Sequence, residues 1–167
     1  LGAQIVGMDG ADKRLDVLAT AIRAGMSVYD LENLELAYAP PFSSGKDPVN
    51  MAGFVASNIM RGDVEMVYWD EIDDLLQKEN TVFIDVRDEE EVEMHPPLNG
   101  ALHIPVNQLR KRLPELDKNK EYIVYCAMGL RGYIAYRMMQ LNGFKVKNMA
   151  GGTTIYNAPK AKLIVDE

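Results

Sequence analysis

The amino-acid sequence predicts an α/β fold, an open parallel sheet with helices on both faces, preceded by a second and smaller unit. Three observations support this prediction. Short apolar segments alternate with segments of helical periodicity through most of the chain. The strand-like segments, such as residues 82–84 and 122–125, are apolar at successive positions, which is typical of parallel strands buried on both faces. The first 58 residues lack this alternation, so we predict units at residues 1–58 and 64–160 and a tail at 161–167.

The larger unit has a regular order of predicted elements. Strands are predicted at residues 81–86, 101–104, 121–125 and 144–148. Helices are predicted at residues 71–78, 89–94, 106–113 and 130–142, with a further short helix after Gly151-Gly152. In the longest of these helices an apolar stripe recurs at helical spacing, and Gly143 is placed to end it. Repeated alternation of this kind predicts a parallel sheet covered by helices.

The smaller unit has fewer predicted elements. We expect a strand at residues 2–7 and a helix at residues 13–24 that ends at Gly25. A second helix, at residues 28–34, is expected to begin with a capping box. Residues 38–48 contain three prolines, which exclude a helix and disfavour a central strand. Because so few elements form a small core, we expect this unit to pack against another body.

Composition excludes several classes of protein. With 167 residues, 47% hydrophobic and 26% charged, the sequence is typical of a soluble globular protein. A net charge of −7 argues against nucleic acid as a partner, and no apolar run is long enough to span a membrane. A single cysteine is consistent with a reducing cytoplasm, and together with two histidines it predicts no metal site.

The charges are unevenly distributed along the chain. Residues 63–93 contain 13 acidic and two basic side chains, whereas residues 94–167 contain five acidic and 11 basic ones, a balance of +6. The basic part includes the lone cysteine. An excess of positive charge raises the encounter rate with anions, so we expect anionic substrates to be favoured.

Cys126 is the candidate nucleophile. It follows the strand predicted at residues 121–125 and precedes a helix, and ligands bind at the carboxyl ends of parallel strands. Inward-facing N–H groups of a tight loop and the start of the next helix both stabilise an anion such as a thiolate. Gly129 allows the loop to curl, and Arg131 can bind an anion beside the sulfur. The alternative is that Cys126 is a small buried apolar residue at a strand end.

Four separated motifs resemble the rhodanese homology domain, over residues 64–160. They are residues 126–131, Asp85-Val86-Arg87, Gly100-Ala101-Leu102-His103-Ile104-Pro105 and Asn148-Met149-Ala150-Gly151-Gly152. The resemblance implies that a cysteine attacks a sulfane sulfur donor, becomes a persulfide and passes the sulfur to an acceptor. On this basis Cys126 and Arg131 are expected to be catalytic, and Asp85 and Arg87 to support the fold below the loop. The residues expected to line the substrate are Ala127, Met128, Gly129, Leu130 and Gly132.

The first unit resembles the end of the dimerisation domain of flavin-dependent pyridine nucleotide-disulfide reductases. The matching segments are residues 12–22, 36–43 and 46–50. The subgroup it resembles comprises coenzyme A-disulfide reductases and NADH-dependent persulfide or polysulfide reductases, which implies a C-terminal piece of a homodimeric parent. The resemblance implies that the tyrosine of the Tyr-Ala-Pro-Pro motif, here Tyr38, reaches the partner subunit's active site. FAD and NAD(P)H are expected in the parent, but this sequence has neither a Gly-x-Gly-x-x-Gly fingerprint nor a second cysteine, so we expect neither cofactor here.

The expected partners are sulfane sulfur donors, namely thiosulfate, polysulfide or coenzyme A persulfide, and thiol acceptors.

Two other functions stay open. The fold can serve as a non-catalytic docking or dimerisation module, although an intact Cys126 and Arg131 argue against this. Cysteine phosphatases of similar architecture place one residue more between cysteine and arginine, whereas here four residues, 127–130, intervene. The narrower loop suits a sulfur atom better than a phosphate.

Overall fold

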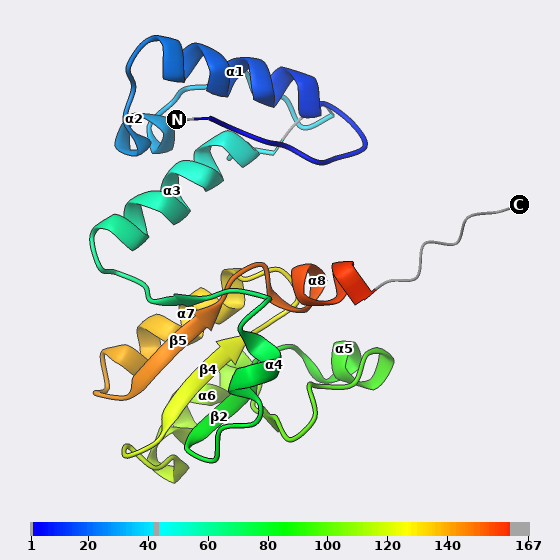
Figure 1. Ribbon diagram of the computed structural model, residues 1–167, viewed down its shortest axis with the longest axis vertical. Helices are drawn as coiled ribbons and strands as arrows, with labels where there is room; N and C mark the ends of the chain where they lie inside the picture. The colour runs from blue at the N-terminus through cyan, green and yellow to red at the C-terminus, as the bar shows by residue number, and fades with distance from the viewer. Residues whose placement is uncertain (1, 42–43, 161–167) are drawn as a thin grey trace, which may run out of the picture. The chain divides into compact units, whose positions relative to one another are not determined.

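The computed structural model describes residues 2–41 and 44–160 of the chain (Figure 1). Contacts between Cα atoms divide it into two compact units, Leu1–Asp63 and Val64–Glu167. The predicted tail at residues 161–167 lies outside the described residues.

The larger unit is built on a five-stranded parallel sheet in the order β1-β5-β4-β2-β3. The strands are β1 (Met66–Val67), β2 (Thr81–Asp85), β3 (Leu102–His103), β4 (Glu121–Tyr125) and β5 (Lys145–Met149). The helices are α4 (Ile72–Leu75), α5 (Glu89–Met94), α6 (Val106–Arg112), α7 (Leu130–Gln140) and α8 (Gly152–Asn157), with 3-10 turns at Leu113–Glu115 and Ala158–Lys160. The predicted α/β fold with a parallel sheet is confirmed. Sequence reasoning missed β1, because a two-residue edge strand carries no periodicity.

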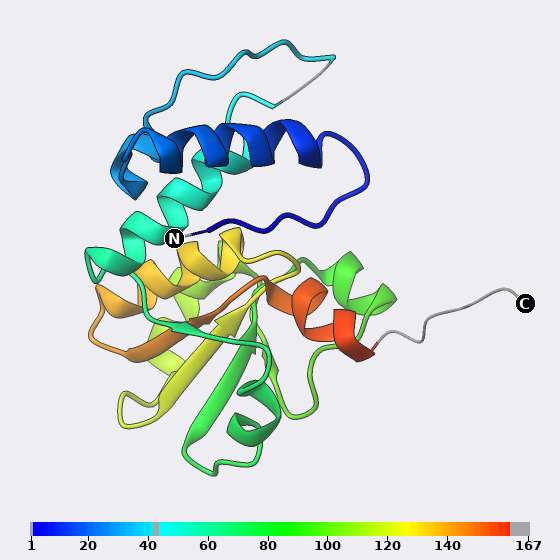
Figure 2. The same ribbon diagram turned by 45° about the horizontal axis from the view of Figure 1, so that its top comes forward.

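Both faces of the sheet are buried, and β4 shows how. Its side chains alternate, so that Tyr122 and Val124 pack with buried residues of α6 and α7. Ile123 and Tyr125 pack on the opposite face, with buried residues of α4 and α8. Figures 1 and 2 show α6 and α7 behind the sheet and α4 in front of it. The alternation continues past the strand, which places the next residue, Cys126, on the α7 face.

The order of the strands brings two loops together at the carboxyl edge of the sheet. β2 lies between β3 and β4. The chain therefore runs from β2 to β3 on one side of β2 and later forms β4 on the other side of β2. Such a change of direction is where ligands bind in open parallel sheets. In this unit it places the segment after β2, including α5, beside the loop after β4.

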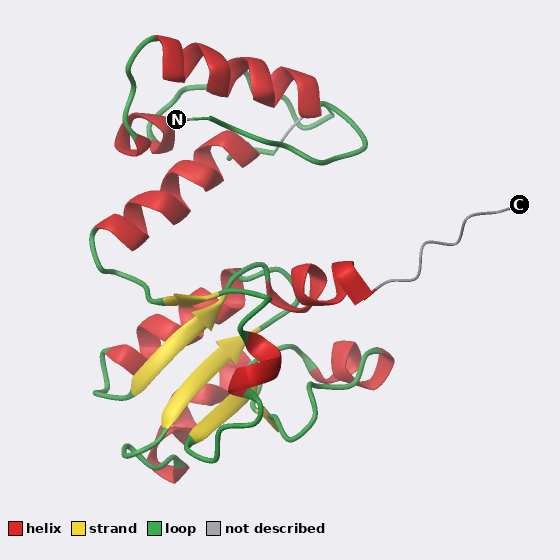
Figure 3. Cartoon of the chain, in the orientation of Figure 1, coloured by secondary structure: helices red, strands yellow, loops and turns green. Residues whose placement is uncertain are grey.

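The smaller unit consists of α1 (Ala11–Arg23), α2 (Val28–Glu32) and α3 (Pro48–Met60) (Figure 3). The capping box predicted at the start of α2 is present, with Ser27 and Asp30 bonded to each other's backbone N–H groups. Helix α3 was not predicted. Asp47 caps it and Pro48 occupies its first turn, where a proline is tolerated, so this proline begins a helix instead of excluding one. The buried face of α3 includes Asn50, Gly53 and Ser57, which gives no apolar stripe.

The strand predicted at residues 2–7 is wrong. These residues form no regular structure, and Val6 is 91% exposed. A strand needs a neighbour for its backbone N–H and C=O groups, and the described part of this unit contains no strand that pairs with the segment.

Candidate active site

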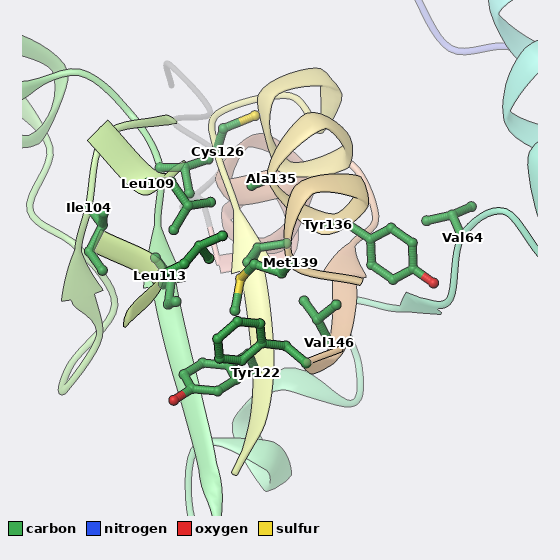
Figure 4. Close-up of a cluster of buried hydrophobic side chains, with 14 residues drawn as sticks. Val64, Ile104, Leu109, Leu113, Tyr122, Cys126, Ala135, Tyr136, Met139 and Val146 are labelled. Atoms are coloured by element: carbon green, nitrogen blue, oxygen red, sulfur yellow. The ribbon is translucent and has the colours of Figure 1, made fainter. Parts of the chain in front are cut away.

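Cys126 lies directly after β4, at the carboxyl edge of the sheet, and is 2% exposed. Figure 4 shows its side chain at the end of the strand, on the side of Ala135 and the other buried residues of α7. The backbone N–H of Gly129 donates a hydrogen bond to Cys126 Sγ over 3.1 Å. The sulfur therefore already has a backbone donor, the kind of group that stabilises a thiolate or a terminal persulfide anion.

Two backbone hydrogen bonds from α8 hold the start of the cysteine loop, residues 126–131. The N–H of Thr153 donates to the carbonyl of Cys126, and the N–H of Thr154 to the carbonyl of Ala127, each over 3.0 Å. These bonds turn the first two carbonyl groups of the loop towards α8. The negative ends of those peptide groups consequently face α8, while the Gly129 N–H faces the sulfur.

Two glycines make this backbone arrangement possible. Gly129 precedes α7 with φ of 115°, a left-handed conformation that side chains other than glycine rarely adopt. Gly152 has φ of 57°, and a Cβ atom there would lie 2.6 Å from the carbonyl oxygen of Ala127 and would also contact that of Cys126. Both the dihedral angle and the close approach therefore require glycine at position 152.

Gly152→Ala is expected to lower the free energy of unfolding by about 3 kcal/mol, because the left-handed strain adds to the clash with the loop carbonyls. Gly100→Ala is the matched control. Gly100 also has a positive φ, of 77°, but a Cβ atom there would have no heavy atom within 4 Å, so a cost of about 1 kcal/mol is expected. Denaturant unfolding followed by the fluorescence of Trp69, the one tryptophan, measures both. Equal costs would contradict the importance of the close approach.

Arg131 is bound by acidic residues. Its guanidinium donates to both carboxylate oxygens of Glu91, with Nη2 2.7 Å from Oε1, and Nη1 lies 2.9 Å from Asp88 Oδ2. Hydrogen bonding to Arg131 lowers the pKa of Glu91 to about 2, and hydrogen bonding to Glu91 raises the pKa of Arg131. The sequence predicted that Arg131 can bind an anion beside the sulfur, and it gave no indication of these pairs with α5 and the residue before it.

Asp85 and Arg87 form a buried ion pair below the loop. Arg87 Nη2 lies 2.6 Å from Asp85 Oδ2, Nε lies 3.0 Å from both carboxylate oxygens, and the Arg87 and Asp85 side chains are 4% and 0% exposed. Arg87 Nη2 also donates to the carbonyl of His95 over 2.9 Å. The pair thus ties the end of β2 to the segment after α5.

The other predicted site residues differ in their placement. Met128 and Leu130 are 78% and 62% exposed, so the side chains that the loop presents to solvent are apolar. Ala127 is half-buried. Gly132 is buried in the first turn of α7 against Asn148 and the Cα of Tyr125, so it packs the helix on the sheet and does not line the loop. Tyr38 belongs to the smaller unit and is 57% exposed.

Three lysines of the basic C-terminal part lie away from Cys126. Lys147 pairs with Glu121, the first residue of β4, over 2.8 Å, and Lys145 is opposite the same residue in the sheet. Lys118 donates to the carbonyl of Asn142, beyond the end of α7. These cations lie towards the amino edge of the sheet, at the opposite end of β4 from Cys126. These three lysines therefore contribute no positive charge beside the cysteine.

Sequence reasoning missed four residues of the site: Asp88, Glu91, Thr153 and Thr154. A signal existed for the first two, because Asp88 and Glu91 have the spacing of a capping box and the structure forms one. Nothing in the sequence indicates that this box binds Arg131. Among the described residues no group of three or more potential metal ligands occurs, and none of their helices is long and apolar enough to cross a membrane.

The parallel sheet and the cysteine loop at its carboxyl edge define the class of this chain. The family model described as Rhodanese-like domain matches residues 68–158, and the chain belongs to that family. The crystal structure of reduced Bacillus anthracis CoADR-RHD is 48% identical, with a TM-score of 0.84 over 89% of this chain and 26% of that one. A NAD-dependent persulfide reductase from A. fulgidus is 43% identical, with a TM-score of 0.79 over 90% of this chain and 26% of that one.

A curated relative matches a shorter segment. Coenzyme A disulfide reductase of Staphylococcus aureus (strain JH9) is 50% identical over 56 residues, which are 34% of this chain and 13% of the relative. The chain therefore spans a minor part of the length of each of these proteins.

Proposed function

We propose that this chain performs rhodanese-type sulfur transfer through a persulfide on Cys126. The observation that carries the proposal is the Gly129 N–H bonded to Cys126 Sγ, in a loop whose carbonyls are turned towards α8. This arrangement offers a hydrogen-bond donor to an anionic sulfur at the carboxyl edge of the sheet. Membership of the rhodanese-like family and similarity to a persulfide reductase support the same chemistry.

The reaction has two steps. The Cys126 thiolate attacks the outer sulfur of a donor such as thiosulfate, so that an Sγ–S bond forms while the donor's S–S bond breaks and its electron pair leaves with sulfite. The persulfide anion then passes its terminal sulfur to a thiolate or to cyanide, and the electron pair of the Sγ–S bond returns to Sγ. No external oxidant or reductant is needed, because the sulfur atom moves without net change in the electron count of the enzyme.

The parent protein proposed for this chain is a cytoplasmic, homodimeric coenzyme A-disulfide or polysulfide reductase that uses FAD and NAD(P)H. The donors would be thiosulfate, polysulfide or coenzyme A persulfide, with thiols as acceptors, and Tyr38 would reach the partner subunit's site. The sequence contains no dinucleotide-binding fingerprint, so no step is assigned to either cofactor.

An activity panel tests the proposal against its two alternatives. The chain is expected to form thiocyanate from cyanide with thiosulfate or an organic thiosulfonate as donor, above a blank without protein. Hydrolysis of an aryl phosphate in place of sulfur transfer would identify a phosphatase. If the chain shows neither sulfur transfer nor phosphate hydrolysis, its function would be that of a docking module, and the proposal would be overturned.

A further inference from the structure

The charge facing a sulfur donor at the Cys126 site depends on whether Arg131 is available. Arg131 is the cation of the cysteine loop, and the Cys126 sulfur is among the negative groups that raise its pKa. Its guanidinium, however, is bonded to both carboxylate oxygens of Glu91 and to Asp88. Two carboxylates against one guanidinium leave this group of side chains with a net negative charge.

The pair is partly shielded and stays ionised. The side chains of Arg131 and Glu91 are 28% and 31% exposed, and the pKa of Glu91 is held at about 2 by hydrogen bonding to Arg131. Glu91 thus keeps its charge at any pH at which a sulfur transfer assay is run. The other side chains that the loop presents to solvent, Met128 and Leu130, are apolar and exposed.

We propose that Glu91 determines the charge preference of the Cys126 site. By binding Arg131 it withholds the guanidinium from the donor, so that the site favours donors of low charge with an apolar group beside the sulfane sulfur over the thiosulfate dianion. This inference rests on the proposed sulfur transfer. Glu91 acts through Arg131 and is a positioning residue.

The test compares two donors that react by the same step. Thiosulfate is a dianion that releases sulfite, and benzenethiosulfonate is a monoanion with an aryl group that releases benzenesulfinate. Thiocyanate formation from cyanide is measured with each donor, and the quantity compared is the ratio of kcat/KM for thiosulfate to kcat/KM for benzenethiosulfonate. The intrinsic reactivities of the donors cancel when this ratio is compared between variants.

Glu91→Gln is expected to raise the ratio about fivefold, through a lower KM for thiosulfate, because the released guanidinium binds the dianion. Glu90→Gln is the matched control. Glu90 is exposed on the same helix and makes none of the bonds to Arg131 described above, so it removes the same charge without releasing the arginine. The control is expected to change the ratio by less than about twofold.

The double variant Glu91→Gln with Arg131→Gln keeps the net charge of the wild type and is expected to return the ratio to the wild-type value. If Glu91→Gln does not fold, Glu91→Asp provides the test. The shorter aspartate side chain loses part of the contact with the Arg131 guanidinium, so a rise in the ratio is again expected.

An unchanged ratio in the folded Glu91 variant, equal rises with Glu90→Gln, or a double variant that keeps the raised ratio would overturn the inference. In each of these cases sulfur transfer itself is still observed. Absence of thiocyanate from both donors with the wild type would instead overturn the proposed function.

Discussion

Cys126→Ser is expected to reduce thiocyanate formation by about a thousandfold or more, to the rate of the blank. A serine hydroxyl is hardly ionised at neutral pH and forms no persulfide, so both steps of the transfer are lost. The substitution removes little from the fold, because serine is similar in size and its oxygen can accept the Gly129 N–H that now bonds to Sγ.

The control for this variant is its free energy of unfolding, followed by Trp69 fluorescence, which is expected to lie within about 1 kcal/mol of the wild type. Inactivity with unchanged stability identifies a chemical role for the sulfur. A Cys126→Ser chain that forms thiocyanate at the wild-type rate would show that the sulfur is transferred elsewhere.

Asp85→Asn is expected to lower the free energy of unfolding by about 3–5 kcal/mol. The change leaves the Arg87 guanidinium buried beside a neutral amide, and removing one partner of a buried pair leaves an uncompensated charge. It also loosens the bond from Arg87 to the carbonyl of His95, which holds the segment after α5.

Glu93→Gln provides the control for Asp85→Asn. It removes one negative charge from an exposed side chain of α5, and is expected to change the free energy of unfolding by less than about 0.5 kcal/mol. Denaturant unfolding curves followed by Trp69 fluorescence give both values. Similar small effects of the two substitutions would contradict a supporting role for the Asp85–Arg87 pair.

The sequence was sufficient to predict four of the five strands, and β2 and β4 are recognisable because they are short and apolar at successive positions. β4 begins and ends at the predicted residues, and the alternation along it explains why Cys126 faces α7. Helix α3 could not be predicted in the same way. Its buried face is formed in part by Asn50 and Ser57, which bond to α2 and the segment after it, and these residues have no apolar periodicity.

Some residues of the site were predicted from the sequence, but the ion pairs of Arg131 were not. Cys126, Gly129 and the Asp85–Arg87 pair are where local patterns indicate. The bonds from Arg131 to Glu91, in contrast, join residues 40 positions apart. They form only because β2 and β4 are neighbours, which brings α5 beside the cysteine loop. The charge balance along the sequence gives no sign of these bonds. It also suggested an excess of positive charge around Cys126, whereas Lys145 lies opposite Glu121, at the far end of β4 from Cys126.

A persulfide on Cys126 is the central element of the proposed function. Mass spectrometry of the full chain after exposure to polysulfide, before and after cyanide is added, measures this directly. The expected result is an increase by the mass of one sulfur atom, located on the peptide that contains Cys126, absent in Cys126→Ser and removed by cyanide with formation of an equal amount of thiocyanate. A chain that forms thiocyanate while this peptide never gains sulfur, or one that gains no sulfur at all, would contradict a persulfide mechanism at Cys126.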